Sequence, residues 1–216
     1  MKQIRGIWLP KTDTHMESHL VRDPLVDGKG TYQFRKYDKA RSHVKRFGHA
    51  VDIGAQIGLW SRVLALDFEH VTSFEPLPLH HACFERNVTS QNVTLHRTAL
   101  ADKASDVTIC TPAATTGNSH VAGPGETSGQ VVEARTLDSF GLTGIDFLKI
   151  DVEGFEYFIL KGAEETIRRE KPVIIVEQKP NNAERYGRGQ HEALALLKSW
   201  GGKELWVMSG DHLVVF

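Results

Sequence analysis

The chain has 216 residues, of which 40% are hydrophobic and 25% charged, and its formal net charge is −1. This composition is ordinary for one globular domain, and the near-neutral charge gives no general attraction to nucleic acid or an anionic membrane. The two cysteines, Cys83 and Cys110, exclude a disulfide framework of the secreted type. No apolar run is long enough for a signal peptide or a membrane span. We therefore expect a soluble cytoplasmic protein that binds neither nucleic acid nor membrane; the oligomeric state stays open.

The first part of the chain differs from the rest. Prolines and glycines interrupt any periodicity in residues 1–30, which we expect to be irregular. Apolar residues from Tyr37 to Phe47 then recur at helical spacing, and Gly48 follows where a helix C-cap would lie. We assign residues 1–47 to an N-terminal extension with a leading helix, which could form a lid over an acceptor. Residues 48–216 form the main domain.

Strands and helices alternate along the main domain. The runs HAVDIG, HVTSFEP, NVTLHRTAL, IDFLKIDVEG and KPVIIVEQKP predict strands separated by helices, including one that runs from Phe155 to Ile167. DVTICTP and VVEARTL predict further strands, and ELWVMS and HLVVF predict a closing hairpin at Gly210 and Asp211. This order indicates an α/β domain with a mainly parallel sheet covered by helices. In such sheets ligands bind beyond the carboxyl ends of the strands.

The stretch VDIGAQIG, residues 51–58, joins a strand to a helix through two glycines. Gly54, followed by Ala55, and Gly58 let a ligand approach the backbone closely. The N–H groups at the start of the helix favour an anion such as a carboxylate. Asp52, just before the turn, could accept a hydrogen bond from a ligand ammonium group. An amino acid moiety carries both groups and suits this turn; close strand-to-helix packing is the alternative reason for the glycines.

A second signal is Glu75, which ends the next strand in FEP, about 20 residues after Gly54. An acid at this distance in a βαβ unit can accept hydrogen bonds from both hydroxyls of a ribose. A nucleoside joined to an amino acid describes S-adenosylmethionine. The main alternative is a dinucleotide, but its fingerprint has glycine where Gln56 stands, so a pyrophosphate would meet a side chain there. The pattern therefore favours S-adenosylmethionine over a nicotinamide cofactor.

The run KIDVEGFE, residues 149–156, places charges beside a predicted buried strand. Lys149 inside such a strand needs a charged partner. Asp151 ends the strand and is a candidate site residue, whereas Glu153 is explained equally well as a residue of a helix-capping turn. Glu177 ends the following strand, so two carboxylates could meet at neighbouring strand ends. They could position or deprotonate a substrate hydroxyl, or hold a hard cation, but without a third ligand we predict no metal site.

Two further features give weaker signals. Ala99 and Leu100, at the end of the third strand, offer an apolar shelf for an adenine ring, although core packing explains them as well. A long loop rich in glycine, threonine and serine, residues 115–130, contains His120, which could take a proton near neutral pH. A mobile surface loop with an incidental histidine is the alternative.

As an ordered set, VDIGAQIG, FEP, TLDSF, KIDVEGFE with LKGA, and PVIIVE resemble the FkbM family of S-adenosylmethionine-dependent methyltransferases over about residues 50–180. The resemblance implies a Rossmann-like class I methyltransferase fold, with a seven-stranded, mostly parallel sheet, helices on both faces and an antiparallel C-terminal hairpin. It also implies cofactor contacts at Asp52, Gly54, Gly58 and Glu75. Members of the family are associated with O-methylation of sugars, polyketides and other acceptors.

We therefore interpret the chain as a methyltransferase that acts on a hydroxyl of a sugar, glycan or small natural product. Asp151, which would also contact the cofactor, is the first candidate for the base, followed by His120, with Glu153 or Glu177 orienting the acceptor. The chain lacks the Asn/Asp-Pro-Pro-Tyr/Phe motif of amino-directed enzymes, which favours oxygen. The alternatives are a nicotinamide-dependent oxidoreductase and a non-catalytic binding module with the same fold.

Overall fold

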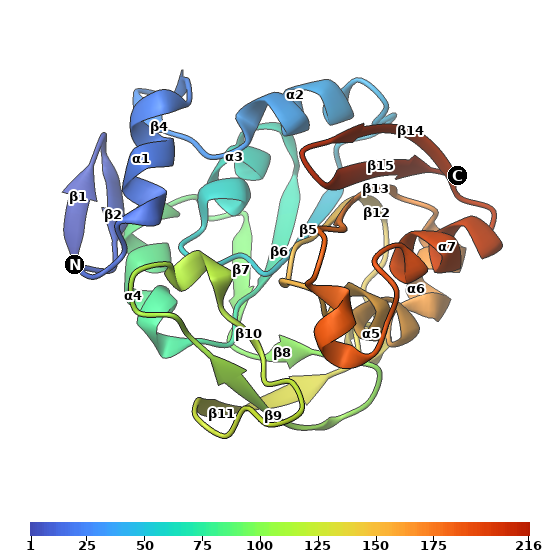
Figure 1. Cartoon of the computed structure of the whole chain (residues 1–216). Coiled ribbons are helices and arrows are strands. Elements are labelled where there is room, and N and C mark those ends of the chain that lie inside the picture. The colour runs from blue at the N-terminus through green and yellow to red at the C-terminus, as the bar shows by residue number, and fades with distance from the viewer.

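The computed structural model describes residues 1–216 and is built around a seven-stranded sheet (Figure 1). From one edge to the other the strands are β14 (Lys203–Met208), β15 (Asp211–Val215), β13 (Val173–Glu177), β12 (Ile145–Ile150), β5 (His49–Ile53), β6 (His70–Phe74) and β7 (Val93–His96). Only β15 runs in the direction opposite to the other strands of the sheet. The predicted α/β fold with a mainly parallel sheet is confirmed. The strand order reverses between β5 and β12, which is the switch point where such sheets bind ligands.

Helices cover both faces of this sheet. They are α2 (Phe34–Arg41), α3 (Leu59–Asp67), α4 (Pro78–Asn87), α5 (Glu156–Lys161), α6 (Glu164–Glu170) and α7 (Glu192–Ser199). Side chains alternate along the strands, so that Leu148 and Ile150 of β12 pack with α5, α6 and α7, while Phe147 packs with α2 and α3. Two separate cores result, one on each face. The near-continuous apolar runs of β12 and β13 are required because these strands are buried on both sides.

The single helix predicted after β12 is divided into α5 and α6, which corrects the sequence prediction. The break lies at Gly162, whose carbonyl accepts a hydrogen bond from Asp138 N at 3.0 Å. The Asp138 carboxylate in turn accepts hydrogen bonds from Glu165 N and Thr166 N in the first turn of α6. The N–H groups that begin α6 are therefore satisfied from outside the helix.

A smaller sheet lies beyond the carboxyl ends of the central strands. Its strands, in order, are β10 (His120–Val121), β9 (Ser105–Cys110), β11 (Gln130–Arg135) and β8 (Ala99–Leu100). The strand predicted from NVTLHRTAL is therefore two strands, because the chain leaves the large sheet after β7 and β8 pairs in parallel with β11. Short 3-10 helices follow at η1 (Thr116–Asn118), η2 (Asp138–Phe140) and η3 (Ala183–Tyr186).

The N-terminal segment contains regular strands and a helix, which corrects the prediction that residues 1–30 are irregular. It contains a hairpin of β1 (Lys2–Ile4) and β2 (Ile7–Leu9), a helix α1 (His15–Arg22), and a hairpin of β3 (Leu25–Val26) and β4 (Lys29–Gly30). The leading helix α2 ends at Arg41, so Val44 and Phe47 lie beyond it, although both still pack in the same core.

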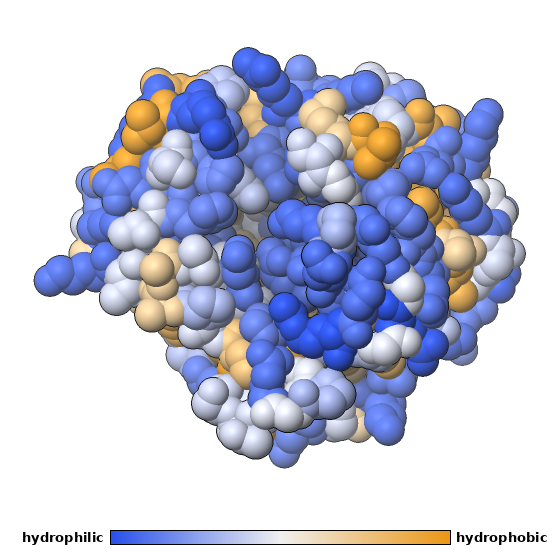
Figure 2. Space-filling view, in the orientation of Figure 1, coloured by the Kyte–Doolittle hydropathy of each residue, from blue (hydrophilic) through white to orange (hydrophobic).

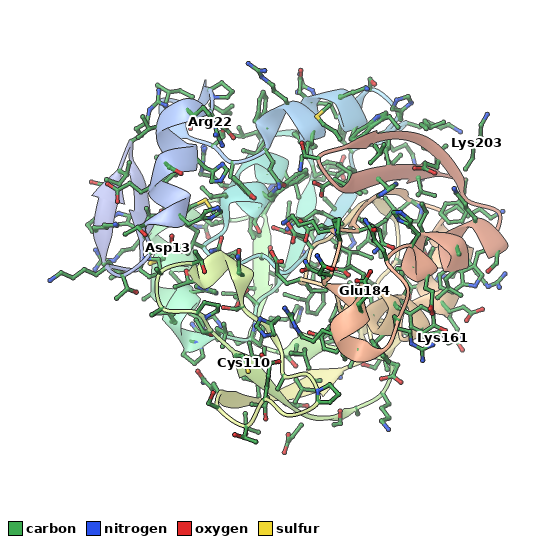
Figure 3. All side chains as sticks on the ribbon, viewed as in Figure 1. Asp13, Arg22, Cys110, Lys161, Glu184 and Lys203 are labelled. Carbon is green, nitrogen blue, oxygen red and sulfur yellow. The ribbon has the colours of Figure 1, made fainter.

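This segment is attached to the main domain by apolar and polar contacts. Leu9 and Leu20 are fully buried in a cluster that also contains Ile57 and Leu59 of the main domain. Asp13, labelled in Figure 3, accepts hydrogen bonds from the backbone N and the hydroxyl of Thr116 in η1. The N-terminal segment therefore packs beside the turn after β5 and holds one end of the long loop.

In Figure 2 the visible face is mostly hydrophilic, and its apolar side chains form separate patches. None of the helices combines the length and apolar character needed to cross a membrane.

Candidate functional site

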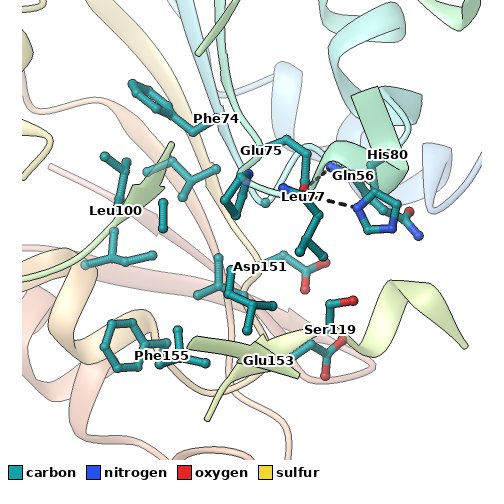
Figure 4. Close-up of a pocket in the computed structure, with 18 of the residues that line it drawn as sticks. Gln56, Phe74, Glu75, Leu77, His80, Leu100, Ser119, Asp151, Glu153 and Phe155 are labelled. Carbon is teal, nitrogen blue, oxygen red and sulfur yellow. Dashed lines mark hydrogen bonds and ion pairs between the residues drawn. The ribbon is translucent and has the colours of Figure 1, made fainter. Parts of the chain in front are cut away.

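Two pockets open beyond the carboxyl ends of the central strands. The first has a volume of about 620 Å³, including space open to solvent, which is suitable for a small molecule. Figure 4 shows the apolar side chains Phe74, Leu100 and Phe155 on one side of it. Glu75, Asp151 and Glu153 lie on the other side.

The second pocket, about 560 Å³ by the same measure, is more polar and lies toward the N-terminal segment. Its lining includes His15, Tyr32, Trp60, Lys149 and Lys179. The two pockets adjoin, because both are lined by Gly54, Gln56, Gly117, Asp151 and Glu153. A ligand in the first pocket would therefore meet a ligand in the second beside Asp151 and Glu153.

The two glycines of the β5–α3 turn have different roles. Both have positive φ, +78° at Gly54 and +83° at Gly58. A Cβ atom at Gly54 would lie 2.0 Å from the carbonyl oxygen of Asp151, so Gly54 lets the β5 and β12 turns approach, and it lines both pockets. A Cβ atom at Gly58 would lie 2.4 Å from Val88 Cγ2. Gly58 lines neither pocket, so packing of α3 against α4 explains it, in place of the predicted ligand contact.

Asp52 is not placed where its predicted role requires. Its side chain is fully buried and lines neither pocket. One oxygen accepts a hydrogen bond from Ser61 Oγ at 2.6 Å, and the other lies 3.6 Å from Lys149 Nζ. The reason is the alternation of the strand, which directs Asp52 sideways into the sheet face beneath α3 rather than toward the strand end. Ala55, predicted beside the same ligand, lines only the second pocket.

Glu75 lies at the wall of the first pocket with its carboxylate held in place. Oε1 accepts a hydrogen bond from Leu77 N and Oε2 from Gln56 N, both at 2.9 Å, and His80 Nδ1 lies 3.1 Å from Oε1 (Figure 4). Burial alone would raise the pKa of Glu75, but His80 and the two N–H groups outweigh it and lower the pKa. The carboxylate is therefore ionised; Oε1 already has two donors, whereas Oε2 keeps a lone pair for a further donor.

The predicted apolar shelf is present beside Glu75. Ala99 and Leu100 line the first pocket together with Phe74, Phe155 and Ile159. Both residues are buried and belong to β8 in the small sheet. The shelf is therefore formed where the chain leaves the central sheet, and it offers a flat ligand ring an apolar contact surface.

Asp151 and Glu153 follow β12 and line both pockets. Lys149 Nζ lies 3.5 Å from Asp151 Oδ2, and its charge, with that of Lys179, lowers the pKa of Asp151 despite burial, which alone would raise it. Glu153 has a left-handed backbone with φ +56°, and its Oε2 accepts a hydrogen bond from Asn182 Nδ2 at 2.9 Å. Burial and the charge of Asp151 raise the pKa of Glu153. The pKa values of the two carboxylates are therefore shifted in opposite directions.

Glu177 and His120 do not line either pocket, contrary to their predicted roles. Glu177 is buried, and its Oε1 lies 2.6 Å from Nζ of Lys179, which lines the second pocket. His120 faces a separate surface hollow, where its Nδ1 lies 3.0 Å from Asn118 O and its Nε2 lies 3.1 Å from Glu126 Oε1. The loop does line the first pocket, but with Thr116, Gly117, Ser119 and Val121 rather than with the histidine.

A group of carboxylates behind the second pocket has the geometry of a cation site. Oxygen atoms of three acids lie within 4.8 Å of one another: Asp151, Glu177 and Asp211. Each acid has an ammonium partner: Lys149 for Asp151, Lys179 for Glu177 and Lys36 for Asp211. These lysines supply the positive charge that a hard cation would bring, so the group fits an internal ion-pair network.

Sequence reasoning missed several residues of the site. Gln56 lines both pockets, and its buried Nε2 has no hydrogen-bond partner, so it is a free donor toward a ligand. The sequence identified Gln56 only as the residue that disfavours a dinucleotide. His80, three positions after Leu77, gave no signal, because its role depends on the turn that brings it back to Glu75. His15 belongs to the segment that was expected to be irregular, and Tyr32 follows it in the N-terminal extension, where no site residue was predicted.

A parallel α/β sheet with a glycine turn after its central strand and an acid after the next defines a class of enzymes that bind a nucleoside cofactor. The chain belongs to the FkbM methyltransferase family: the model of the methyltransferase FkbM domain matches residues 52–203. This confirms the predicted family and, with it, S-adenosylmethionine as the cofactor.

Comparison with solved structures gives the same fold. The methyltransferase FkbM from Methylobacillus flagellatus is similar to 82% of this chain, with 20% identity and a TM-score of 0.55. The matched part is only 46% of that protein's own length. Precorrin-6y C5,15-methyltransferase from Geobacter metallireducens has 12% identity and a TM-score of 0.50, with 97% of each chain covered. SMU.1697c, a Streptococcus mutans methyltransferase in complex with SAH, has 9% identity and a TM-score of 0.51 over 84% of this chain and 94% of its own. No curated protein matches the sequence.

Proposed function

We propose that this protein transfers a methyl group from S-adenosylmethionine to a hydroxyl group of a sugar, glycan or small natural product. The observation that carries the proposal is the meeting of two pockets at Asp151 and Glu153. The first pocket has an apolar shelf and a fixed carboxylate, whereas the second is lined by hydrogen-bonding side chains. Such a pair can hold a nucleoside donor and a polar acceptor side by side.

The first pocket fits the cofactor. Glu75 would accept a hydrogen bond from a ribose hydroxyl through Oε2, and Ala99 and Leu100 would contact the adenine ring. The unpartnered Nε2 of Gln56 would donate to the carboxylate of the amino acid moiety, next to the backbone of Gly54. When bound, S-adenosylmethionine supplies an electrophilic methyl group. The protein therefore needs mainly to align the acceptor and to exclude water.

The second pocket is proposed as the acceptor site. Acids, lysines and Tyr32 around it can exchange hydrogen bonds with several hydroxyl groups of one ligand. His15, Met16 and Tyr32 come from residues 1–47, so the N-terminal segment forms one wall of this site. We therefore assign to this segment the role of shaping and covering the acceptor.

A hydroxyl acceptor must lose its proton as it is methylated. Asp151 and Glu153 are the two carboxylates that line both pockets. The lowered pKa of Asp151 makes it a weak base but a good hydrogen-bond acceptor, whereas the raised pKa of Glu153 makes it the stronger base. The opposite shifts favour Glu153 as the base that takes the proton, with Asp151 orienting the hydroxyl. This reverses the order expected from the sequence.

The test begins with calorimetric titration of cofactor-stripped protein with S-adenosylhomocysteine, and with NAD under the same conditions. Binding of S-adenosylhomocysteine alone is expected. Transfer of a labelled methyl group is then measured across a panel of hydroxylated acceptors and a matched panel of amines. Methylation of amines only would refute the oxygen-directed proposal, and binding of NAD instead would refute the methyltransferase assignment.

A further inference from the structure

A second group of chemically reactive side chains lies outside both pockets, on the small sheet. Cys110 ends β9 and His120 begins β10, and the two are direct partners in the antiparallel register, so their side chains share one face. Glu126 comes from the loop that follows β10. Each of the three offers one sulfur, nitrogen or oxygen atom, and these atoms lie within 4.8 Å of one another. Figure 3 labels Cys110 on the small sheet.

The hydrogen bonds of His120 leave one contact that needs a positive charge. Its Nδ1 lies 3.0 Å from the carbonyl oxygen of Asn118, and because a carbonyl only accepts, Nδ1 carries the hydrogen. In the neutral ring Nε2 then presents a lone pair, and it lies 3.1 Å from Glu126 Oε1, which is also an acceptor. Two acceptors at this distance require either a second ring proton or a cation between them. Tetrahedral zinc places neighbouring nitrogen and oxygen ligands about 3.3 Å apart.

We propose that Cys110, His120 and Glu126 bind a divalent transition metal ion, with Zn²⁺ as the best fit. Thiolate, imidazole and carboxylate together are a donor set typical of zinc. The supporting contacts also match, because Asn118 O fixes the tautomer of His120, and Gly123 N donates to Glu126 Oε2 at 2.7 Å. On binding, the Cys110 thiol gives up its hydrogen bond to the carbonyl of residue 128 and releases its proton to solvent.

The ion would close the loop that covers the first pocket. Residues 111–119 connect the ligands Cys110 and His120, and within them Thr116, Gly117 and Ser119 line that pocket. Asp13 already holds Thr116 from the opposite side. A metal ion between the two stems restricts the open conformations of the loop, so it should strengthen binding in the first pocket. This second step rests on the proposed function, whereas metal binding itself does not.

The first experiment is a titration of Co²⁺ into tag-free, reduced protein, followed by absorption spectroscopy. A thiolate-to-cobalt charge-transfer band is expected, and Zn²⁺ should abolish it by displacement. Cys110→Ser should lose the band, and His120→Gln should weaken binding. His43→Gln and Glu133→Gln change an exposed histidine and an exposed acid elsewhere and should bind as the wild type does. Absence of the band would overturn the proposal and indicate an imidazolium–carboxylate pair. Persistence of the band in Cys110→Ser would also overturn it and indicate that cobalt binds at Cys83.

The second experiment measures the affinity for S-adenosylhomocysteine with Zn²⁺ and with a chelator. Affinity should rise about fivefold or more with the metal, and by linkage the ligand should raise the metal affinity by the same factor. Equal affinities in protein that binds cobalt would overturn the loop-closure step alone. If S-adenosylhomocysteine does not bind in either condition while cobalt binds, the proposed function fails and the metal site stands.

Discussion

The Glu75→Gln substitution gives the sharpest test of the cofactor pocket, because both oxygens of this carboxylate are already engaged. Oε1 accepts from Leu77 N and Oε2 from Gln56 N, so a glutamine must turn its NH₂ group toward one of these donors. It also loses the negative charge toward the ribose and leaves only one oxygen to accept. A hydrogen bond to a charged group contributes about 1.5–3 kcal/mol, so the affinity for S-adenosylhomocysteine should fall roughly 10- to 150-fold.

Calorimetric titration measures this loss directly. Glu85→Gln is the matched control, because its side chain is on α4 but exposed, and its affinity should equal that of the wild type. Thermal unfolding of both variants separates a local effect from a general loss of structure; Glu75→Gln should remain folded but melt earlier. A folded Glu75→Gln protein that binds S-adenosylhomocysteine with the wild-type dissociation constant would refute the ribose contact.

Three further predictions concern the base, the glycine turn and pH. Glu153→Gln should lower kcat by about 100-fold or more without changing the affinity for S-adenosylhomocysteine, whereas Asp151→Asn should mainly raise the acceptor KM; steady-state kinetics compare them. Gly58→Ala should cost about 1–3 kcal/mol more than Gly28→Ala in urea denaturation, because both have positive φ but only the first is overpacked. Burial raises the pKa of Glu156 from 4.5 to about 7. As the pH rises from 4.5 to 7, the unfolded chain loses this proton while the folded protein keeps it, so ΔG of unfolding should fall by about 3 kcal/mol and then level off above pH 7. Glu156→Gln should remove this slope in denaturation curves; an unchanged slope would refute that pKa.

The central sheet could be predicted because its inner strands, such as β12 and β13, are buried on both faces. Short apolar runs such as residues 173–177 predict buried strands. The helices between these runs predict that neighbouring strands are parallel. The N-terminal hairpins could not be predicted in the same way, because strands of two or three residues are too short to show a period of two. Their turns gave no strong signal either: Arg5 and Gly6 both adopt positive φ, but Arg-Gly is not a typical pair for such a turn.

Site residues that directly follow a parallel strand could be predicted from the sequence. Those whose side-chain direction depends on packing or strand register could not. Glu75 and Asp151 follow the strands, and residues after parallel strands lie at one edge of the sheet. Asp52 lies within its strand, so the alternation of side chains controls its direction. His120 was assigned to the pocket because its loop covers it, but the β9–β10 register turns that side chain to the outer face. Register is a property of pairing and is not visible in the local sequence.

Lys149 links the buried Asp52, which lines neither pocket, to the carboxylates of the proposed site. Burial alone would lower the pKa of this lysine, but Asp151 and Asp52 together raise it, so the ammonium group stays charged inside the sheet. Its Nζ lies 3.6 Å from Asp52, 3.5 Å from Asp151 and 3.4 Å from the carbonyl of Gly54, and so connects the turns after β5 and β12. The charge keeps Asp151 ionised, and an ionised Asp151 is one cause of the raised pKa of Glu153. We therefore propose that Asp52 acts on the proposed base through Lys149 and Asp151 rather than through contact with a ligand.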